Sequence, residues 1–434
     1  MSKLTILTAI ALSSNLLLTA CSGGGSNSNA ATVATDTNTD NSSSSNTTCS
    51  DAIEKGLTLG ISALPPSTAA TYQAAFCKYA QLLAPNGKTI GIYAQDEISN
   101  EQLLRARNIL SFFLAPVAGA TQGSDKSPVA NAMANNGATL VLMNGSDDGN
   151  NPLPENVDGQ PLYATELVVE GSTAYIDNDY ENHRDAAFEE ILHLVHDYGI
   201  GTSGPDAAPG GNATYQIAID SARENAMANA LWPTAGVDAD TTNWIEELRQ
   251  EGSLSQEYLA SVIDSYYGYW GAWTEGTGGM WGIYAAKTRT DVQNMDPLGY
   301  ALVEQFFNPT VTYLARIDSI FTGDLPLSFD AARPYTHKSQ YLVNAQLTGS
   351  SNSNLTGNDH ANRLAGNAGS NTLDGKAGND TAVLQGNYAD YTVDISGSEI
   401  ILQDSVNDRD GVLTLLNIER LEFKDQTVIP PINN

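Results

Sequence analysis

The stretch that decides the fold runs from Asn182 to Gly199 and reads NHRDAAFEEILHLVHDYG. On a helix, each residue advances by about 100°, so the ionisable side chains from position 189 onward fall on one wedge. They are Glu189, Glu190, His193, His196 and Asp197. The remaining circumference is apolar, and Gly199 stands where helices commonly end. The stretch therefore predicts a helix that is buried along more than half of its circumference.

Two carboxylates and a histidine converge on this wedge, which is a common way to build a metal site. The run Glu189-Glu190-Ile191-Leu192-His193 resembles the HExxH helix of zincin metallopeptidases, with a Glu in place of the first His. The resemblance implies that Glu189 and His193 ligate Zn²⁺ and that Glu190 activates a water molecule. The extra carboxylate at position 189 adds negative charge, which makes a zinc-bound water less acidic.

The third metal ligand is open at this point. The extended zincin motif would place a third His at position 199, where this chain has Gly199. We therefore expect an acid from a later part of the chain. Glu275 is preferred, because a solitary acid among aromatic residues needs a partner to justify its burial. The alternatives are His196, Asp220 and Glu224.

Around this helix, the hydrophobic periodicity predicts an α+β fold, with a small sheet first and a largely helical half after it. We expect helices at residues 67–83, 100–114 and 128–134, strands at 89–93 and 138–143, and a β-hairpin formed by 161–170 and 173–177. The zincin resemblance implies that residues 49–345 form one zincin-like domain around the helix with the active site.

The N-terminal segment predicts export and lipidation. Residues 1–20 have the charge and the apolar run of an export signal. The end of this segment, Leu-Leu-Leu-Thr-Ala-Cys21, resembles the lipobox of bacterial lipoproteins, which implies that Cys21 is lipidated. Ser22 in place of Asp then favours the outer membrane, so we expect a cell-envelope lipoprotein that is periplasmic or surface-exposed. Residues 21–48 are mostly small and polar, which predicts a flexible tether.

The cysteine count favours one disulfide. The chain has three cysteines, and acylation of Cys21 leaves Cys49 and Cys77 as an even pair. An exported protein meets an oxidising compartment, so we expect these two residues to form a disulfide.

A nine-residue period begins at Leu355 and continues at Leu364 and Leu373. It resembles RTX (haemolysin-type) repeats, which implies a short parallel β-roll within residues 346–434 that binds Ca²⁺ between its turns. The ligand position of the repeats is filled by Asn362, Asn371 and Asp380. Since only one of these is a carboxylate, we expect a weak calcium site or none.

The charge of the chain limits its partners. Lys and Arg together number 20 and Asp and Glu together 50, for a net charge of -30. This charge excludes nucleic acid bound through a basic face.

Several functions stay open at the level of sequence. The first is a lipid-anchored, zinc-dependent metallopeptidase that cleaves a peptide or protein substrate and carries a vestigial calcium-binding module. The second is a non-catalytic surface or adhesive lipoprotein that keeps the scaffold with structural calcium or another metal. A third is metal storage or sensing. The plainest alternative is an amphipathic surface helix that binds no metal.

Overall fold

The computed structural model describes residues 42–203 and 208–431. The predicted signal segment 1–20 and the lipidation site Cys21 lie outside the described residues, as does the predicted tether up to residue 41. Helix α1 (Ser42–Gly56) begins before Cys49, where we expected the folded domain to start. Within the described ranges, no helix is long and apolar enough to cross a bilayer.

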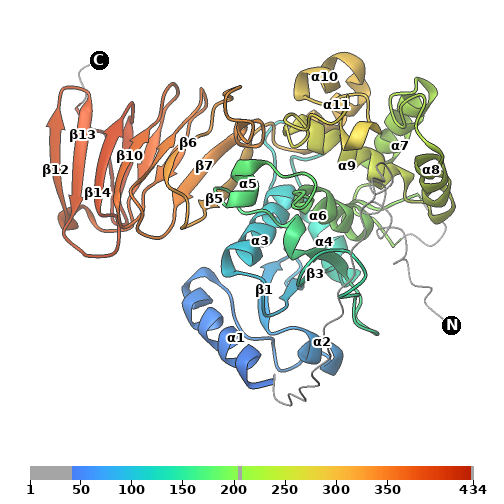
Figure 1. The fold of residues 1–434 in the computed structure, drawn as a ribbon, viewed down its shortest axis with the longest axis horizontal. Coiled ribbons are helices and arrows are strands. Elements are labelled where there is room, and N and C mark those ends of the chain that lie inside the picture. Colours follow the sequence, from blue (N-terminus) through green and yellow to red (C-terminus); the bar gives the residue numbers. More distant parts are fainter. Residues whose placement is uncertain (1–41, 204–207, 432–434) are drawn as a thin grey trace, which may run out of the picture.

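The described part of the chain is α+β, as predicted, and its strands form three sheets (Figure 1). The first sheet has the order β1-β2-β3-β4, in which β1 alone runs antiparallel to its neighbour. Its strands are β1 (Lys78–Leu83), β2 (Thr89–Ala94), β3 (Thr139–Met143) and β4 (Gln160–Tyr163). Leu140, Val141 and Leu142 of β3 are fully buried, so both faces of this inner strand are covered.

Four of the expected elements in this half are confirmed. They are the strands β2 and β3 and the helices α3 (Asn100–Leu114) and α4 (Ser127–Asn135). The expected helix at 67–83 is wrong beyond α2 (Ala70–Ala75), because residues 78–83 pair with β2 as strand β1.

The expected hairpin over 161–177 is also wrong. Strand β4 ends at Tyr163, and residues Thr173–Asp177 form the short helix α5. The Ser172 hydroxyl caps this helix by accepting a hydrogen bond from the backbone N–H of Tyr175.

Helix α6 (Ala187–Val195) is the predicted central helix, and every one of its residues is buried. It packs against α3, against α9 (Leu254–Tyr266) and against strand β4. Figure 1 shows α6 between α3 and α9. The chain then makes a π-helical turn over His196–Ile200. The remaining helices of this half are α7 (Ala213–Ala228), α8 (Ala239–Glu251), α10 (Arg289–Met295) and α11 (Pro297–Phe306).

A buried ion-pair network ties α3 to the segment that leads into α6. Two nitrogens of Arg105 donate to the carboxylate of Asp185, at 2.9 and 2.7 Å, and its Nε donates to Glu170 at 3.0 Å. All three side chains are at most 4% exposed. Because Asp185 lies just before α6, this network fixes where the central helix begins.

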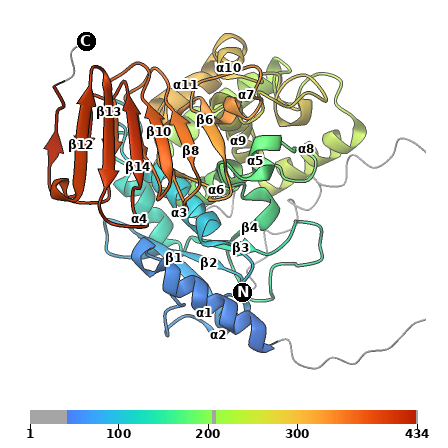
Figure 2. The same cartoon turned by 60° about the vertical axis from the view of Figure 1, so that its left-hand side comes forward.

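From residue 311 onward, strands β5 to β12 alternate between two further sheets, whereas β13 and β14 stay in the sheet of β12, and β15 and β16 return to the other. Figure 2 shows the sheet that contains β6, β8 and β10. One sheet has the order β16-β15-β11-β9-β7-β5 and the other β12-β13-β14-β10-β8-β6. Most neighbouring strands of these two sheets are parallel. The antiparallel pairs are β12–β13, β13–β14 and β15–β16. The alternation begins with β5, before residue 346, where we expected the second unit to start.

The strands of the first sheet are β5 (Val311–Ile317), β7 (Leu342–Leu347), β9 (Arg363–Ala365), β11 (Thr381–Val383), β15 (Arg420–Glu422) and β16 (Thr427–Val428). Those of the second are β6 (Gly323–Pro326), β8 (Ser353–Thr356), β10 (Ser370–Asp374), β12 (Tyr391–Ser396), β13 (Glu399–Asp404) and β14 (Val412–Leu416).

The nine-residue period places one leucine in each successive strand. Leu355, Leu364 and Leu373 lie in β8, β9 and β10, and each is fully buried. Leu355 and Leu373 are paired in register in one sheet, while Leu364 belongs to the other. The period therefore reflects burial of one apolar side chain per strand between the two sheets.

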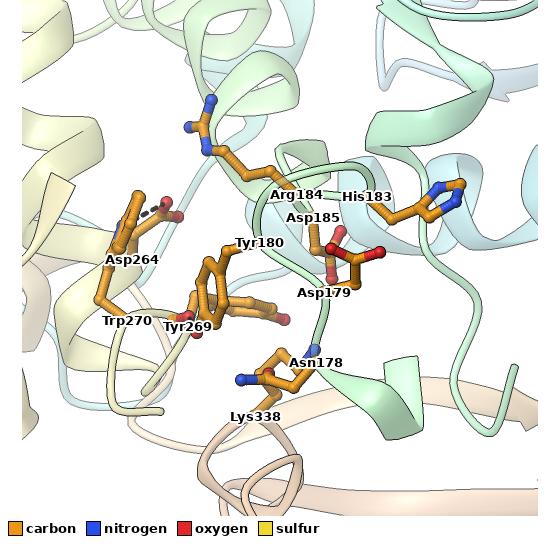
Figure 3. A pocket seen from close by; sticks show the side chains of 10 residues that line it. All are labelled: Asn178, Asp179, Tyr180, His183, Arg184, Asp185, Asp264, Tyr269, Trp270 and Lys338. Carbon is orange, nitrogen blue, oxygen red and sulfur yellow. Dashed lines mark hydrogen bonds between the residues drawn. The ribbon is translucent and has the colours of Figure 1, made fainter. Parts of the chain in front are cut away.

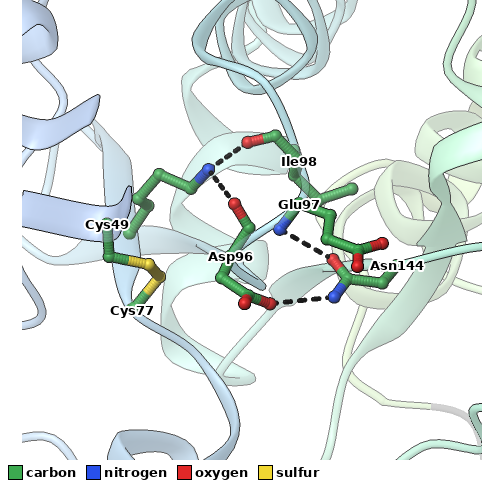
Figure 4. The surroundings of a disulfide bond; sticks show 7 residues. Cys49, Cys77, Asp96, Glu97, Ile98 and Asn144 are labelled. Carbon is green, nitrogen blue, oxygen red and sulfur yellow. Dashed lines mark hydrogen bonds between the residues drawn. A yellow bond between two sulfur atoms is a disulfide. The ribbon is translucent and has the colours of Figure 1, made fainter. Parts of the chain in front are cut away.

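The two cysteines of the described chain lie together at the edge of the first sheet. Cys49 belongs to α1 and Cys77 precedes β1, and their sulfur atoms are at bonding distance, with 6.2 Å between the Cα atoms (Figure 4). Asn144, which follows β3, donates to the carboxylate of Asp96 nearby. The pair thus joins the N-terminal helix to the sheet.

Candidate metal centre

One group of ligand-type side chains comes together in the described structure, on the two facing helices α6 and α9. Glu189 and His193 of α6 and Glu257 of α9 each offer one ligand atom, and these atoms lie within 4.8 Å of one another. The His193 Nε2 atom is 3.6 Å from Glu257 Oε1. Glu189 and His193 are each 5% exposed, so the group is enclosed by the core.

The donor atoms of this group fit a divalent metal ion. His193 Nε2 is buried without a hydrogen-bond partner among the described residues. Buried polar atoms in folded proteins nearly always have such a partner. Two carboxylates and an imidazole form a donor set that suits Zn²⁺ and several other divalent metals. The structure thus shows a Glu-His-Glu group that is close enough to bind a metal.

Arg184 neutralises part of the charge of this group. Its Nη2 contacts the Glu189 carboxylate as an ion pair. Its guanidinium also lies over the Trp281 ring, 4.4 Å from the ring centroid. The Glu189 carboxylate therefore belongs to the Glu-His-Glu group and also forms an ion pair with a cation of the protein.

Glu190 lies on the other side of the His193 ring. Its Oε2 atom is 3.7 Å from His193 Nδ1 and accepts a hydrogen bond from Gln160 Nε2 at 2.7 Å. A carboxylate beside the second ring nitrogen favours a proton on that nitrogen and leaves Nε2 free to act as a ligand. Glu190 is thus next to the group, but it faces the nitrogen that points away from Glu257.

The carboxylates around His193 shift its protonation. Burial alone lowers the pKa of His193, but the charges of Glu257 and Glu190 outweigh it and raise the pKa to about 9. Burial raises the pKa of Glu257. The neighbouring carboxylates therefore favour the protonated imidazole of His193 when no metal is bound.

Arg184, the partner of Glu189, also lines a small hollow, which Figure 3 shows. Arg184 and Asp264 both line it, and Trp270 Nε1 donates to Asp264 Oδ2 at 3.3 Å. Burial raises the pKa of Asp264 to about 7. The free volume of about 10 Å³ has room for one water molecule and too little for a substrate side chain.

Glu275, our preferred third ligand, is not part of the group. It is exposed in the loop that follows α9, and Glu257 stands in its place beside Glu189 and His193. The aromatic residues near Glu275 in the sequence, such as Tyr266 and Trp270, are buried in the core. The aromatic residues near Glu275 in the sequence therefore pack in the core, and they do not surround the side chain of Glu275.

The three alternative ligands also lie outside the group. His196 is fully buried, but its Nε2 pairs with Gln216 Oε1, and burial lowers its pKa to about 4. Asp220 accepts hydrogen bonds from Ser203, Gln216 and Ser255. Glu224 has a side chain that is 72% exposed and lies 3.5 Å from Arg223, as expected of a pair on a helix surface.

Glu257 was missed, although the sequence contains a signal for it. Twelve of the thirteen residues of α9 are buried, and Glu257 itself has a side chain that is only 12% exposed. An acid inside so apolar a helix needs a partner. The spacing of Glu257 and Asp264, two turns apart, also puts both acids on one side of the helix.

No family model matches this chain, and no curated protein matches it either. What the group has in common with the zincin pattern is the spacing of Glu189, Glu190 and His193 on one helix, together with a carboxylate from a later helix.

The three residues expected to bind calcium do not form one site. Asn362 and Asp380 precede β9 and β11 of one sheet, whereas Asn371 lies in β10 of the other. The amide of Asn371 both accepts from Asn367 N and donates to Asn367 Oδ1, at 2.9 Å each. Asn362 forms the same pair of bonds with Asn358, at 2.8 and 3.0 Å.

The Asp380 carboxylate also forms a hydrogen bond within the protein. Its Oδ1 accepts the backbone N–H of Asn362 at 2.7 Å, so it links two turns of the same sheet directly. Burial, with the charge of Glu419 added, raises its pKa to about 6. All three side chains are thus used in hydrogen bonds between or within the turns.

Proposed function

We propose that this protein is a zinc-dependent hydrolase of peptide bonds, with Glu189, His193 and Glu257 as the metal ligands. The observation that carries the proposal is the enclosed Glu-His-Glu group on α6 and α9, with ligand atoms within 4.8 Å of one another. A zinc ion bound there supplies a Lewis acid that polarises the substrate carbonyl. The substrate we propose is a peptide or protein.

Glu190 has two roles in this proposal. Glu190 is the residue that the zincin spacing assigns to accept the proton of the attacking water, although its carboxylate lies on the Nδ1 side of His193. The 2.7 Å hydrogen bond from Gln160 holds its carboxylate in place. Glu190 also orients the imidazole of His193 from the Nδ1 side, where its Oε2 lies 3.7 Å away.

We further propose a zincin-like arrangement for the first part of the chain and a short β-roll for the last part. The four-stranded sheet packed beside α6 supports the former, and the alternation of parallel strands between two sheets supports the latter. In this roll, asparagine amides take the place of Ca²⁺. Anchoring to the outer membrane through Cys21 rests on the lipobox alone.

Two measurements test the enzyme proposal: the zinc content of the purified protein, and cleavage of casein or of a peptide library. They are repeated for Glu190→Gln and His193→Ala. We expect wild-type protein to bind zinc and cleave, Glu190→Gln to bind zinc without cleaving, and His193→Ala to lose both. A wild-type protein without bound transition metal would overturn the proposal.

A second candidate function is favoured by the ion pair of Arg184 with Glu189. This pair satisfies the charge of the first ligand without a metal, and the adjoining hollow has room for water only. Both features suit a non-catalytic surface or adhesive lipoprotein. Bound metal without cleavage, or no metal at all, would favour it.

A further inference from the structure

An open groove lies between the turn after β1 and the facing ends of α3 and α4, and none of the three residues of the Glu-His-Glu group lines it. Its free volume is about 290 Å³, at the lower end of the range for sites that bind small molecules. The walls are aliphatic and include Leu82, Leu83, Ile90, Leu114 and Ala130. Of the residues that line it, Lys126 alone is charged.

Lys126 is buried without a counter-charge. It is 1% exposed, and its Nζ donates to the Phe113 carbonyl at 2.8 Å and lies 4.3 Å from the centroid of the Phe306 ring. Within the described ranges, no carboxylate forms an ion pair with it. Lysine is almost never fully buried unless it is paired.

The known contacts of Lys126 account for only part of its bonding capacity. Phe113 lies in the last turn of α3, where a cation is favoured by the helix dipole. An ammonium group has three N–H donors, however, and the described residues provide one acceptor. An anionic ligand would supply both the missing acceptor and the missing charge.

We propose that this groove binds an aliphatic carboxylate, with the carboxylate paired to Lys126 and the hydrocarbon chain lying along the leucines. The aliphatic walls match the chain, and Lys126, a basic residue without an acidic partner, matches the head group. Each methylene that the groove buries should tighten binding about fourfold. The proposal does not depend on the metal centre or on the proposed enzyme.

Calorimetric titration of the full chain with octanoate tests the proposal, with hexanoate and octylammonium as comparison ligands. We expect octanoate to bind, hexanoate to bind more than tenfold more weakly because two methylenes are missing, and octylammonium not to bind. Octanoate that binds no better than octylammonium, or no binding at all, would overturn it.

Three variants locate the ligand. Lys126→Met keeps the length of the side chain but removes the charge. Octanoate should then bind no more tightly than octylammonium. Ser111→Trp places a bulky ring at an exposed position in the lining and should block octanoate even if Lys126→Met fails to fold. Lys88→Met, at an exposed lysine outside the lining, should leave binding unchanged. If Ser111→Trp instead breaks a dimer and octanoate does not bind, the occupant is a second copy of the chain and the proposal is wrong.

Discussion

The His193 Nε2 atom lies 3.6 Å from Glu257 Oε1, and this pair joins the two helices that carry the Glu-His-Glu group. His193 and Glu189 come from α6, so one helix supplies two of the three ligand atoms. The third depends on how α9 packs against α6. The Glu-His-Glu group is therefore a product of tertiary packing as much as of the local motif.

Replacing Glu257 should separate its role from that of Glu275. We expect Glu257→Gln to weaken zinc binding by about tenfold or more, because the group loses one of its two anionic ligands. Glu275→Gln should leave zinc affinity unchanged, because this side chain is exposed in a loop. Competition with a chromogenic zinc chelator measures both. Equal losses for the two variants would show that the metal is held elsewhere.

The Arg105 network makes a second prediction, on stability. Arg105→Leu leaves the buried carboxylates of Glu170 and Asp185 without their cation, so the free energy of unfolding should fall by about 3–5 kcal/mol. Arg316→Leu is the matched control: Arg316 pairs with Glu101 at 2.7 Å, but the two side chains are 19% and 27% exposed. The Arg316→Leu variant should lose about 1 kcal/mol or less of its free energy of unfolding. Urea unfolding of both variants gives the comparison.

The sequence predicted the central helix well because a helix obeys a local rule. The wedge formed by Glu189, Glu190 and His193 depends only on the rotation per residue. The leucine period at Leu355, Leu364 and Leu373 is local in the same sense, since each repeat fills one strand.

The failures came from residues whose state depends on distant partners. Residues 78–83 are a strand because they pair with β2, although their apolar spacing also suited a helix. Glu275 and Glu257 are both acids near aromatic residues, and only the packing of α9 against α6 shows which one meets His193. Spacing along the chain carries no information about that contact.

The asparagines of the repeat make a third prediction, on calcium. In calcium-free buffer, wild-type protein should unfold at the same temperature as in buffer with added calcium, since Asn362 and Asn371 already satisfy the turns. Asn371→Asp turns the donor to Asn367 Oδ1 into an acceptor, and should cost about 1–3 kcal/mol without calcium.

Asn354→Asp is the matched control for this prediction. The Asn354 Oδ1 atom accepts the backbone N–H of Thr372 at 2.8 Å, and an aspartate can accept it equally well. This variant should therefore unfold close to the wild-type temperature. A wild-type protein that calcium stabilises by several degrees would contradict the assignment of the asparagines as substitutes for the ion.

Lys126 makes the last prediction, on the pH dependence of stability. Burial lowers the pKa of Lys126 from 10.5 to about 7 in the folded protein. Between these two values, the unfolded chain holds a proton on this residue that the folded protein has released, so stability rises with pH. The contribution is about 1.4 kcal/mol per pH unit, and it ends above the pKa of the unfolded chain. Lys126→Met lacks this pH-dependent contribution.

The difference in unfolding free energy between the variant and wild type is measured by urea titration without ligand. It should favour the variant near pH 7 and shrink as the pH approaches 10. A difference that stays constant over this range would contradict a lowered pKa of Lys126 in the folded protein.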